Sequence, residues 1–303
     1  MDLSVIISGL LSGGLYATIG LGLSLVFGVM RLVNLAHGEF IVLGAYFASL
    51  VMGQLGIDPF LSLIVVVPLM MLLAYPVQRY LFTGLLRRGV EPPLVAAFGL
   101  SLLLIAAITQ LFGGNARSLN ANYASQGVDV LGQRLRVIDL VGLGLGIILV
   151  VVTHLVMTRS KWGAALRAAA SDPLTAGTMG INVERVYALT FAVSAGIAAI
   201  GGIVIGVGYS FTPTSGTSFM LIGFTVVVIG GVGSVMGTLW GGLVLGVIQS
   251  VGSSVFGGQY RDLVIYATFI LVLALKPTIE RMRDSSASRP LALKPSKVVK
   301  AHA

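Results

Sequence analysis

The apolar residues of the chain fall into long, nearly uninterrupted runs that are separated by short polar stretches. A helix needs about 20 apolar residues to cross the hydrocarbon core of a bilayer. On this measure the sequence predicts spans at residues 3–29, 36–53, 60–82, 93–112, 138–158, 186–209, 219–232, 235–256 and 262–276. Two of the later runs are short or split by glycine, so the predicted fold is all-α, a polytopic transmembrane bundle of eight to ten spans.

The composition supports this class. Of the 303 residues, 56% are hydrophobic and 10% are charged, whereas soluble domains carry about 25% charged residues. A transmembrane β-barrel would show short alternating segments instead. The formal charge of +8 comes from residues between the spans and in the tail, which favours a lipid bilayer over nucleic acid as the partner. The chain has no cysteine, which excludes a disulfide, a thiol nucleophile and a thiolate metal site.

The positive charges orient the predicted spans, because Lys and Arg of short loops accumulate on the cytoplasmic side. This rule places the arginine pair at 87–88, the basic stretch 159–185 and the C-terminal tail in the cytoplasm, and the N-terminus outside. The loop 113–137 conflicts with the rule, because it falls outside and yet contains arginines. We expect residues 1–283 to form the membrane domain and residues 284–303 to form a basic, disordered cytoplasmic tail.

Glycines four residues apart recur within the predicted spans. This spacing puts both glycines on one helical face, where they let two helix backbones approach closely in the membrane. The pairs are Gly9/Gly13, Gly142/Gly146, Gly202/Gly206, Gly237/Gly241 and Gly242/Gly246. As a set they predict a tightly packed bundle.

Two polar interruptions, residues 31–39 and 230–238, break the apolar pattern, and a helix rich in small residues follows each. Glycine-broken segments at matching places in two halves are typical of transporters with inverted repeats and discontinuous helices. The candidate pathway or broken-helix residues are Asn34, His37, Gly38, Glu39, Gly230, Gly231, Gly233 and Ser234. The alternatives are a polar cytoplasmic turn for the first interruption and a plain helix hairpin for the second, the hairpin being somewhat favoured.

Motifs for catalysis are not found in the sequence. It contains no phosphate-binding loop of the Gly-x-x-x-x-Gly-Lys-Ser/Thr type. The three histidines are scattered, so no metal site is expected and no residue is assigned as catalytic. The spans also contain no series of acidic or basic residues that could couple transport to protons. A transporter of this kind needs an external source of work.

Three stretches resemble a known family. Residues Gly20–Tyr46 and Gly230–Gly242 resemble the LivH-type permease of branched-chain amino-acid ABC importers, and Arg167–Asn182 resembles the cytoplasmic loop of that family. The resemblance runs in order from about Gly9 to Lys276, and the basic tail is not part of it.

The resemblance implies a non-catalytic permease subunit in a bacterial inner membrane. Its implied partners are a second, LivM-like permease, two cytoplasmic ATPases that bind ATP and Mg, and a periplasmic binding protein that delivers the substrate. No cofactor is expected in this chain itself.

The basic stretch 159–185 is then implied to be a coupling loop that docks on the ATPases. We expect a short helix between Trp162 and Ala170 that stops at Asp172 and Pro173, and a second turn that ends at Gly180. The expected coupling residues are Arg167, Asp172, Ala176 and Gly180.

The residues themselves do not identify the substrate. The family resemblance favours branched-chain or related small amino acids, with urea or short amides as the alternative. A self-contained channel or secondary carrier would need a selectivity or ion site, for which only Asn34, His37 and Glu39 are candidates. A purely structural membrane subunit is disfavoured by the glycine-broken segments.

Overall fold

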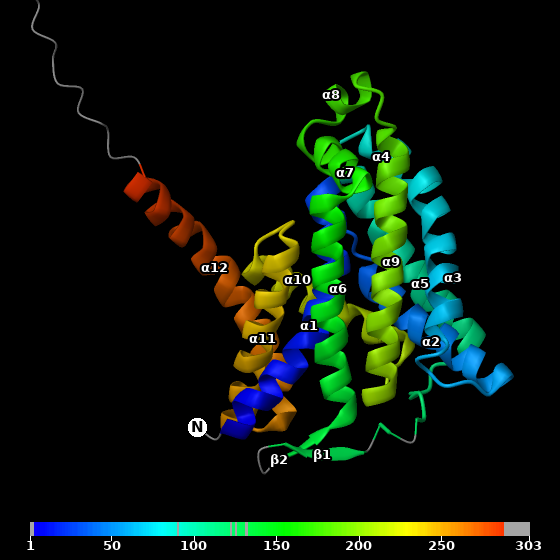
Figure 1. Ribbon diagram of the computed structural model, residues 1–303, viewed down its shortest axis with the longest axis vertical. Helices are drawn as coiled ribbons and strands as arrows, with labels where there is room; N and C mark the ends of the chain where they lie inside the picture. The colour runs from blue at the N-terminus through cyan, green and yellow to red at the C-terminus, as the bar shows by residue number, and fades with distance from the viewer. Residues whose placement is uncertain (1–2, 90, 122, 125, 131–132, 288–303) are drawn as a thin grey trace, which may run out of the picture.

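The computed structural model describes residues 3–89, 91–121, 123–124, 126–130 and 133–287. Within these residues, nine helical runs are long and apolar enough to cross a membrane, and each corresponds to one predicted span. The predicted polytopic helical bundle is therefore confirmed (Figure 1). The tail expected at 284–303 begins inside the last helix, which continues to Ala287, and its remaining residues lie outside the described part of the chain.

The elements follow one another along the chain with few long connections. Their bounds are α1 Leu3–Met30, α2 His37–Leu55, α3 Leu63–Pro76, a π-helix Val77–Phe82, α4 Thr83–Leu86, α5 Glu91–Phe112, β1 Gly127–Val130, β2 Gln133–Arg136, α6 Val137–Arg159, α7 Lys161–Ser171, α8 Pro173–Thr178, α9 Val183–Gly208, a 3-10 turn Pro213–Ser215, α10 Gly216–Gly230, α11 Val235–Phe256, a 3-10 turn Gly258–Tyr260 and α12 Arg261–Ala287.

The bundle has two distinct ends. The short helices α7 and α8 form one of them, which we call the α8 end, and the strands β1 and β2 lie at the other, the hairpin end (Figure 1). The strands pair antiparallel, with Gly127 opposite Arg136 and Val130 opposite Gln133. The sequence did not predict this hairpin. It occupies the polar loop 113–137, and buried Leu135 anchors it to the bundle.

Two groups of helices have the same arrangement but cross the bundle in opposite directions. Helix α1 runs from the hairpin end to the α8 end and packs against α11, whereas α9 runs the other way and packs against α3. Helix α2 packs against α9 and α10, and α10 packs against α1 and α2. The series α1–α2–α3–α5 and α9–α10–α11–α12 therefore form an inverted repeat, the architecture of many transporters.

Glycine explains the most extensive helix contact, between α1 and α11. The pair Gly9/Gly13 of α1 faces the pair Gly242/Gly246 of α11, and a Cβ atom added at Gly13 would lie 2.6 Å from the Cα atom of Leu243. Such an approach leaves no room for a side chain. The spacing of small residues thus predicted a real interface between helices that are far apart in sequence.

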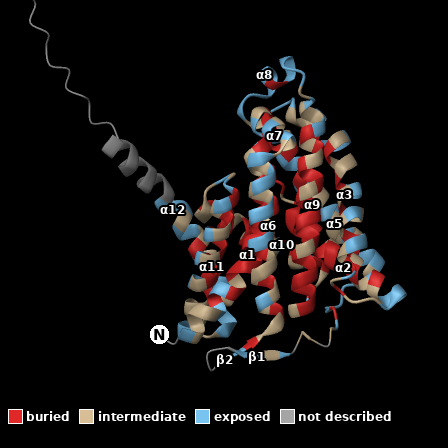
Figure 2. Ribbon diagram, in the orientation of Figure 1, coloured by how far each residue is buried: buried red, intermediate tan, exposed pale blue. Residues whose placement is uncertain are grey.

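Burial separates a central pair of helices from an outer layer. In the most apolar 18-residue segments of α1 and α9, 83% of the residues are buried, whereas in those of α5 and α6 only 17% are buried (Figure 2). The exposed positions of the outer helices carry large apolar residues, including Leu103 and Ile148. This is the pattern of a bundle whose outer surface faces lipid or another apolar helix.

Candidate functional site

The segment α7–α8 is held rigidly by local capping. Ser160 caps α7 by accepting a hydrogen bond from the backbone N–H of Gly163 at 2.9 Å. The buried face of α7 consists of Gly163, Leu166 and Ala169, three residues apart, and packs onto the bundle. The hydroxyl of Tyr187 in α9 donates to the carbonyl of Ala169 at 3.3 Å. The segment is thereby joined to α6 at one end and to α9 at the other.

Asp172 separates the two short helices, as its position before a proline predicted. Its Oδ1 accepts hydrogen bonds from the backbone N–H groups of Leu174 and Thr175 at 3.0 and 3.2 Å, so it caps α8. The Thr175 hydroxyl donates to its Oδ2 at 2.5 Å. The Thr175 hydroxyl, followed by these backbone N–H groups, holds the pKa of Asp172 below its usual range. The carboxylate is therefore kept ionised at neutral pH.

The other expected coupling residues lie in the same segment. Ala176 is buried and its carbonyl accepts the N–H of Ile181 at 3.1 Å, which closes the end of α8. Gly180 has a φ of 84°, and no atom lies within 4 Å of the point where a Cβ atom would stand, so the backbone and not the space requires glycine. Arg167 is exposed on α7. The predicted helix, break and second turn are all present, and their role in coupling stays a prediction.

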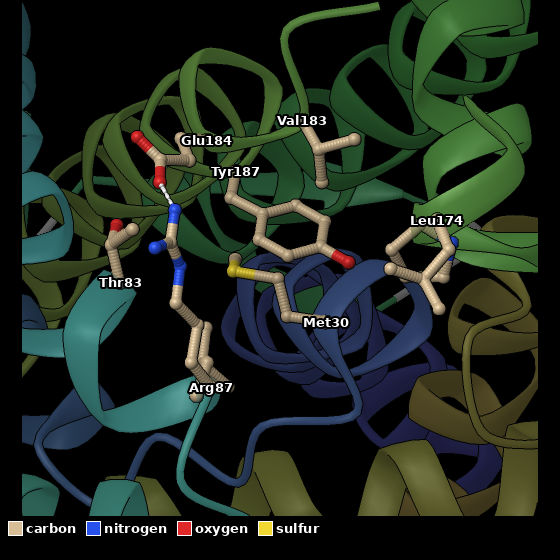
Figure 3. Close-up of a pocket in the computed structure, with 9 residues that line it drawn as sticks. Met30, Thr83, Arg87, Leu174, Val183, Glu184 and Tyr187 are labelled. Atoms are coloured by element: carbon tan, nitrogen blue, oxygen red, sulfur yellow. Dashed lines mark hydrogen bonds and ion pairs between the residues drawn. The ribbon is translucent and has the colours of Figure 1, made fainter. Parts of the chain in front are cut away.

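A cleft of about 550 Å³ lies beneath α8 (Figure 3). Met30 at the end of α1, Leu174 of α8 and Tyr187 of α9 line it, with Thr83 and Arg87 contributed from α4 and its end. Glu184 forms ion pairs with Arg79 and Arg87 at its rim. The cleft thus lies between α8 and the ends of α1 and α4.

The first polar interruption enters the bundle. The chain turns at Arg31, whose φ of 52° is the single positive φ of a non-glycine residue in the described chain, and residues 31–36 have no regular structure. Asn34, His37 and Glu39 are each at most 2% exposed. Nε2 of His37 lies 3.1 Å from the carbonyl oxygen of Ile19, deep within α1. Of the two interpretations, the structure therefore supports a broken, re-entrant segment and not a surface turn.

Helix α2 begins where helix α10 begins. A Cβ atom added at Gly38 would lie 2.6 Å from the carbonyl carbon of Gly216, and one added at Gly216 would lie 3.0 Å from Oε1 of Glu39. Oε2 of Glu39 has no hydrogen-bond partner among the described residues. Two half-helices therefore point their N-termini, which carry partial positive charge, at a buried carboxyl group in the interior.

The second polar interruption is a tight turn. Residues 231–234 connect α10 to α11 at the α8 end, with φ values of 90° and 77° at Gly231 and Gly233, and Ser234 caps α11 by accepting from the N–H of Gly237 at 3.0 Å. The plain helix hairpin is thus the interpretation that the structure supports. Gly233 packs on Gly28 of α1. The residues at 230–234 are therefore apart from Glu39, and a pathway role for them stays a prediction.

The two polar interruptions do not occupy equivalent places in the inverted repeat. The counterpart of 31–36 in the inverted repeat is the segment 209–215, between α9 and α10. The polar run from Ser210 to Ser218, which includes Pro213, is the signal that could have identified it. The predicted spans left this run as a connecting loop.

The inverted repeat, the half-helices that meet in the interior and the short helices at one end define a multi-spanning transport permease. The family model for the permease component of branched-chain amino acid transport systems matches residues 5–273, so the chain belongs to this family. It is a permease subunit of the ABC importer type.

Several characterised proteins are similar to this chain. The high-affinity branched-chain amino acid transport system permease protein BraD of Pseudomonas aeruginosa is 33% identical, over 91% of this chain and 94% of its own length. LivH of Escherichia coli K12, of the same description, is 29% identical over 89% of this chain and 92% of its own length. The fructose import permease protein FrcC of Rhizobium meliloti is 29% identical over 82% of this chain and 71% of its own length. No solved structure matches the chain.

Proposed function

We propose that this chain is the inner-membrane permease subunit of a bacterial importer for branched-chain amino acids, driven by separate ATPase subunits. With a second, homologous permease it forms the translocation pathway, and a periplasmic binding protein delivers the substrate. The similarity to BraD and LivH over nine-tenths of the chain supports the substrate class. ATP and Mg are bound by the partner ATPases and not by this chain.

The observation that carries the proposal is the placement of α7 and α8. These helices are capped, are fixed to α6 and α9, and adjoin α1 and α4 across the cleft lined by Met30 and Leu174. Large apolar side chains at the tip are exposed, with Leu174 at 85% and Met179 at 78%. An ATPase that binds this tip in two nucleotide states moves the adjoining spans, because work enters as a difference in contacts between the states.

The basic residues support an orientation. Helices α4 and α6 end, and α7 and α9 begin, at the α8 end. These helix ends carry the basic residues Arg87, Arg88, Arg159, Lys161 and Arg185, and such residues accumulate on the cytoplasmic side. The α8 end is then cytoplasmic and the hairpin end periplasmic. A cytoplasmic C-terminal tail is part of this proposal, and the start of α12 at the hairpin end supports it.

Reconstitution tests the function. The chain, its partner permease and the ATPases are placed in liposomes, and uptake of labelled leucine is measured with the binding protein and ATP. We expect uptake that requires both. Flux through the chain alone would instead indicate a self-contained channel or carrier. Unlabelled competitors test the substrate class, and isoleucine and valine in excess should suppress the uptake. If urea, acetamide or ribose suppresses it instead, the substrate belongs to the class of that competitor.

A further inference from the structure

A second pocket lies near the hairpin end, between α1, α9, α10 and α12. It has a volume of about 210 Å³ and is separate from the cleft beneath α8. Its lining combines a cation, a carboxylate and hydroxyl groups with a set of large apolar side chains. None of these residues was predicted from the sequence to form a site.

The cation is Arg261, the first residue of α12. Its guanidinium donates to the Tyr16 hydroxyl at 2.7 Å and lies 5.3 Å from the centre of the Tyr209 ring. Among the described residues no carboxylate lies within salt-bridge distance of it, although Asp262 is its neighbour in the chain. A guanidinium carries five N–H donors, so Arg261 keeps donors for an anion in the pocket.

The start of α10 adds a second group that attracts anions. Ser215 and Ser218 line the same pocket, where the 3-10 turn Pro213–Ser215, capped by Thr212, leads directly into this 15-residue helix. The start of a helix carries partial positive charge, which favours an anion nearby. Arg261 and the α10 N-terminus therefore both face one pocket, and exposed Asp262 supplies a negative charge beside them.

The deeper part of the pocket is apolar. Helix α10 runs away from the hairpin end, so Ile222 lies about 6 Å deeper than Ser218. Ile19 of α1 and Ile205 of α9 also line the pocket. A ligand that fits has charged groups at one end and a short aliphatic group at the other.

We propose that this pocket is a transit site for an aliphatic α-amino acid. The carboxylate of the amino acid binds Arg261 beside the positive end of α10, its ammonium group binds Asp262, and its side chain lies between Ile19 and Ile222. This inference rests on the proposed function and deepens it, because a neutral sugar has no carboxylate that could form a charge-assisted pair with Arg261. The permease itself then contributes to selectivity, in addition to the binding protein.

Cysteine labelling tests the site without relying on transport. The chain has no cysteine, so Ser218→Cys introduces one thiol into the pocket of a complex whose partner subunits are also cysteine-free. The rate of modification by an impermeant maleimide is measured with millimolar leucine, with isoamylamine, which lacks the carboxylate, and with ribose. We expect leucine alone to slow labelling. Ser254→Cys, exposed near the end of α11, is the control and should not respond to any of the three.

Equal rates with leucine and ribose would overturn the proposal, and protection by ribose alone would assign the pocket to a sugar. Arg261→Gln should weaken the leucine protection roughly tenfold or more, as expected for the loss of a hydrogen bond to a charged group, and Arg261→Lys should restore part of it. Tyr16→Phe removes the contact with Arg261 but keeps the guanidinium, so protection should remain. Loss of protection in Tyr16→Phe equal to that in Arg261→Gln would mean that Arg261 has only a structural role.

Uptake by the wild-type complex in the same liposomes distinguishes failure of the proposed function from failure of the proposed transit site. Without ATP-dependent leucine uptake, the proposed function fails whatever the labelling shows. Uptake without leucine protection at Ser218→Cys refutes the pocket alone.

Discussion

Gly38 of α2 and Gly216 of α10 bring two half-helices into direct backbone contact in the interior of the bundle. A Cβ atom at Gly38 would also lie 3.0 Å from the backbone nitrogen of Met220, so neither helix has room to accept a side chain there. The contact joins the two halves of the inverted repeat at the point where the helical path of each half is interrupted. Glu39 follows directly and is buried at this junction.

We predict that Gly38→Ala destabilises the protein. The added methyl group forces the half-helices apart, and overpacking of this kind costs about 1–3 kcal/mol. The measurement is the temperature at which the protein unfolds in detergent, which is monitored as the loss of the monodisperse peak. Gly99→Ala in α5 is the matched control, because no atom lies within 4 Å of its added Cβ, and it should be near neutral. Equal stability of the two variants would contradict the close contact.

The spans and the α7–α8 segment could be predicted because their signals are local. A run of about 20 apolar residues specifies a span whatever it packs against, and Ser160, Asp172 and Gly180 act through hydrogen bonds or backbone angles within a few residues. The glycine pairs could be predicted as packing faces for the same reason, although the sequence did not say that Gly9 faces Gly246.

The interior of the bundle could be predicted only in part. A polar stretch has the same sequence pattern whether it lies at the surface or re-enters the bundle. The burial of Asn34 depends on the helices packed around it. The matching break at 209–215 lacks the repeated glycines that are present at 230–238. Arg261 lies at the start of a span, where a basic residue is ordinary, and only the fold brings Tyr16 and Ser218 to its side.

The ionised Asp172 should stabilise α8 down to acidic pH. Its folded pKa is depressed, so the cap contributes stability that is complete above the unfolded pKa of about 3.9 and is lost as the pH falls through the lower folded pKa. Asp172→Ala should therefore increase hydrogen exchange at the amides of Leu174 and Thr175 at neutral pH. Asp172→Ser keeps a capping oxygen and should restore most of the protection. Unchanged exchange in the alanine variant would show that the cap does not hold these amides.

Glu184 should contribute modestly to stability, and unequally through its two ion pairs. The Arg79 side chain is 36% exposed and that of Arg87 is 74% exposed, while Glu184 is 31% exposed. Partly solvated pairs are worth less than about 1 kcal/mol each, so Arg79→Gln should cost more than Arg87→Gln. Double-mutant cycles with Glu184→Gln, at low and high salt, measure both couplings. A larger coupling for Arg87 would contradict this order.

Gly180→Val should uncouple ATP hydrolysis from uptake. A φ of 84° is strained for any side chain, costing about 1–2 kcal/mol, and more for a β-branched residue. The strain falls on the turn that joins α8 to α9, so the tip shifts while the spans remain intact. In liposomes the variant complex should hydrolyse ATP, and uptake of leucine per ATP should fall severalfold. Insertion, measured as the amount of folded protein in the membrane, should be unchanged.

Gly177 provides the matched control for this variant. It lies three residues earlier, within α8, and has the same open space around it, but its φ is not positive. Gly177→Ala therefore adds a side chain to the same tip without straining the backbone, and coupling should be retained. If both variants uncouple, the tip is sensitive to any added atom and contact with the ATPase is the cause. If neither variant uncouples hydrolysis from uptake, the backbone angle at Gly180 is not needed to transmit the motion. The assignment of a coupling role to this turn is then wrong.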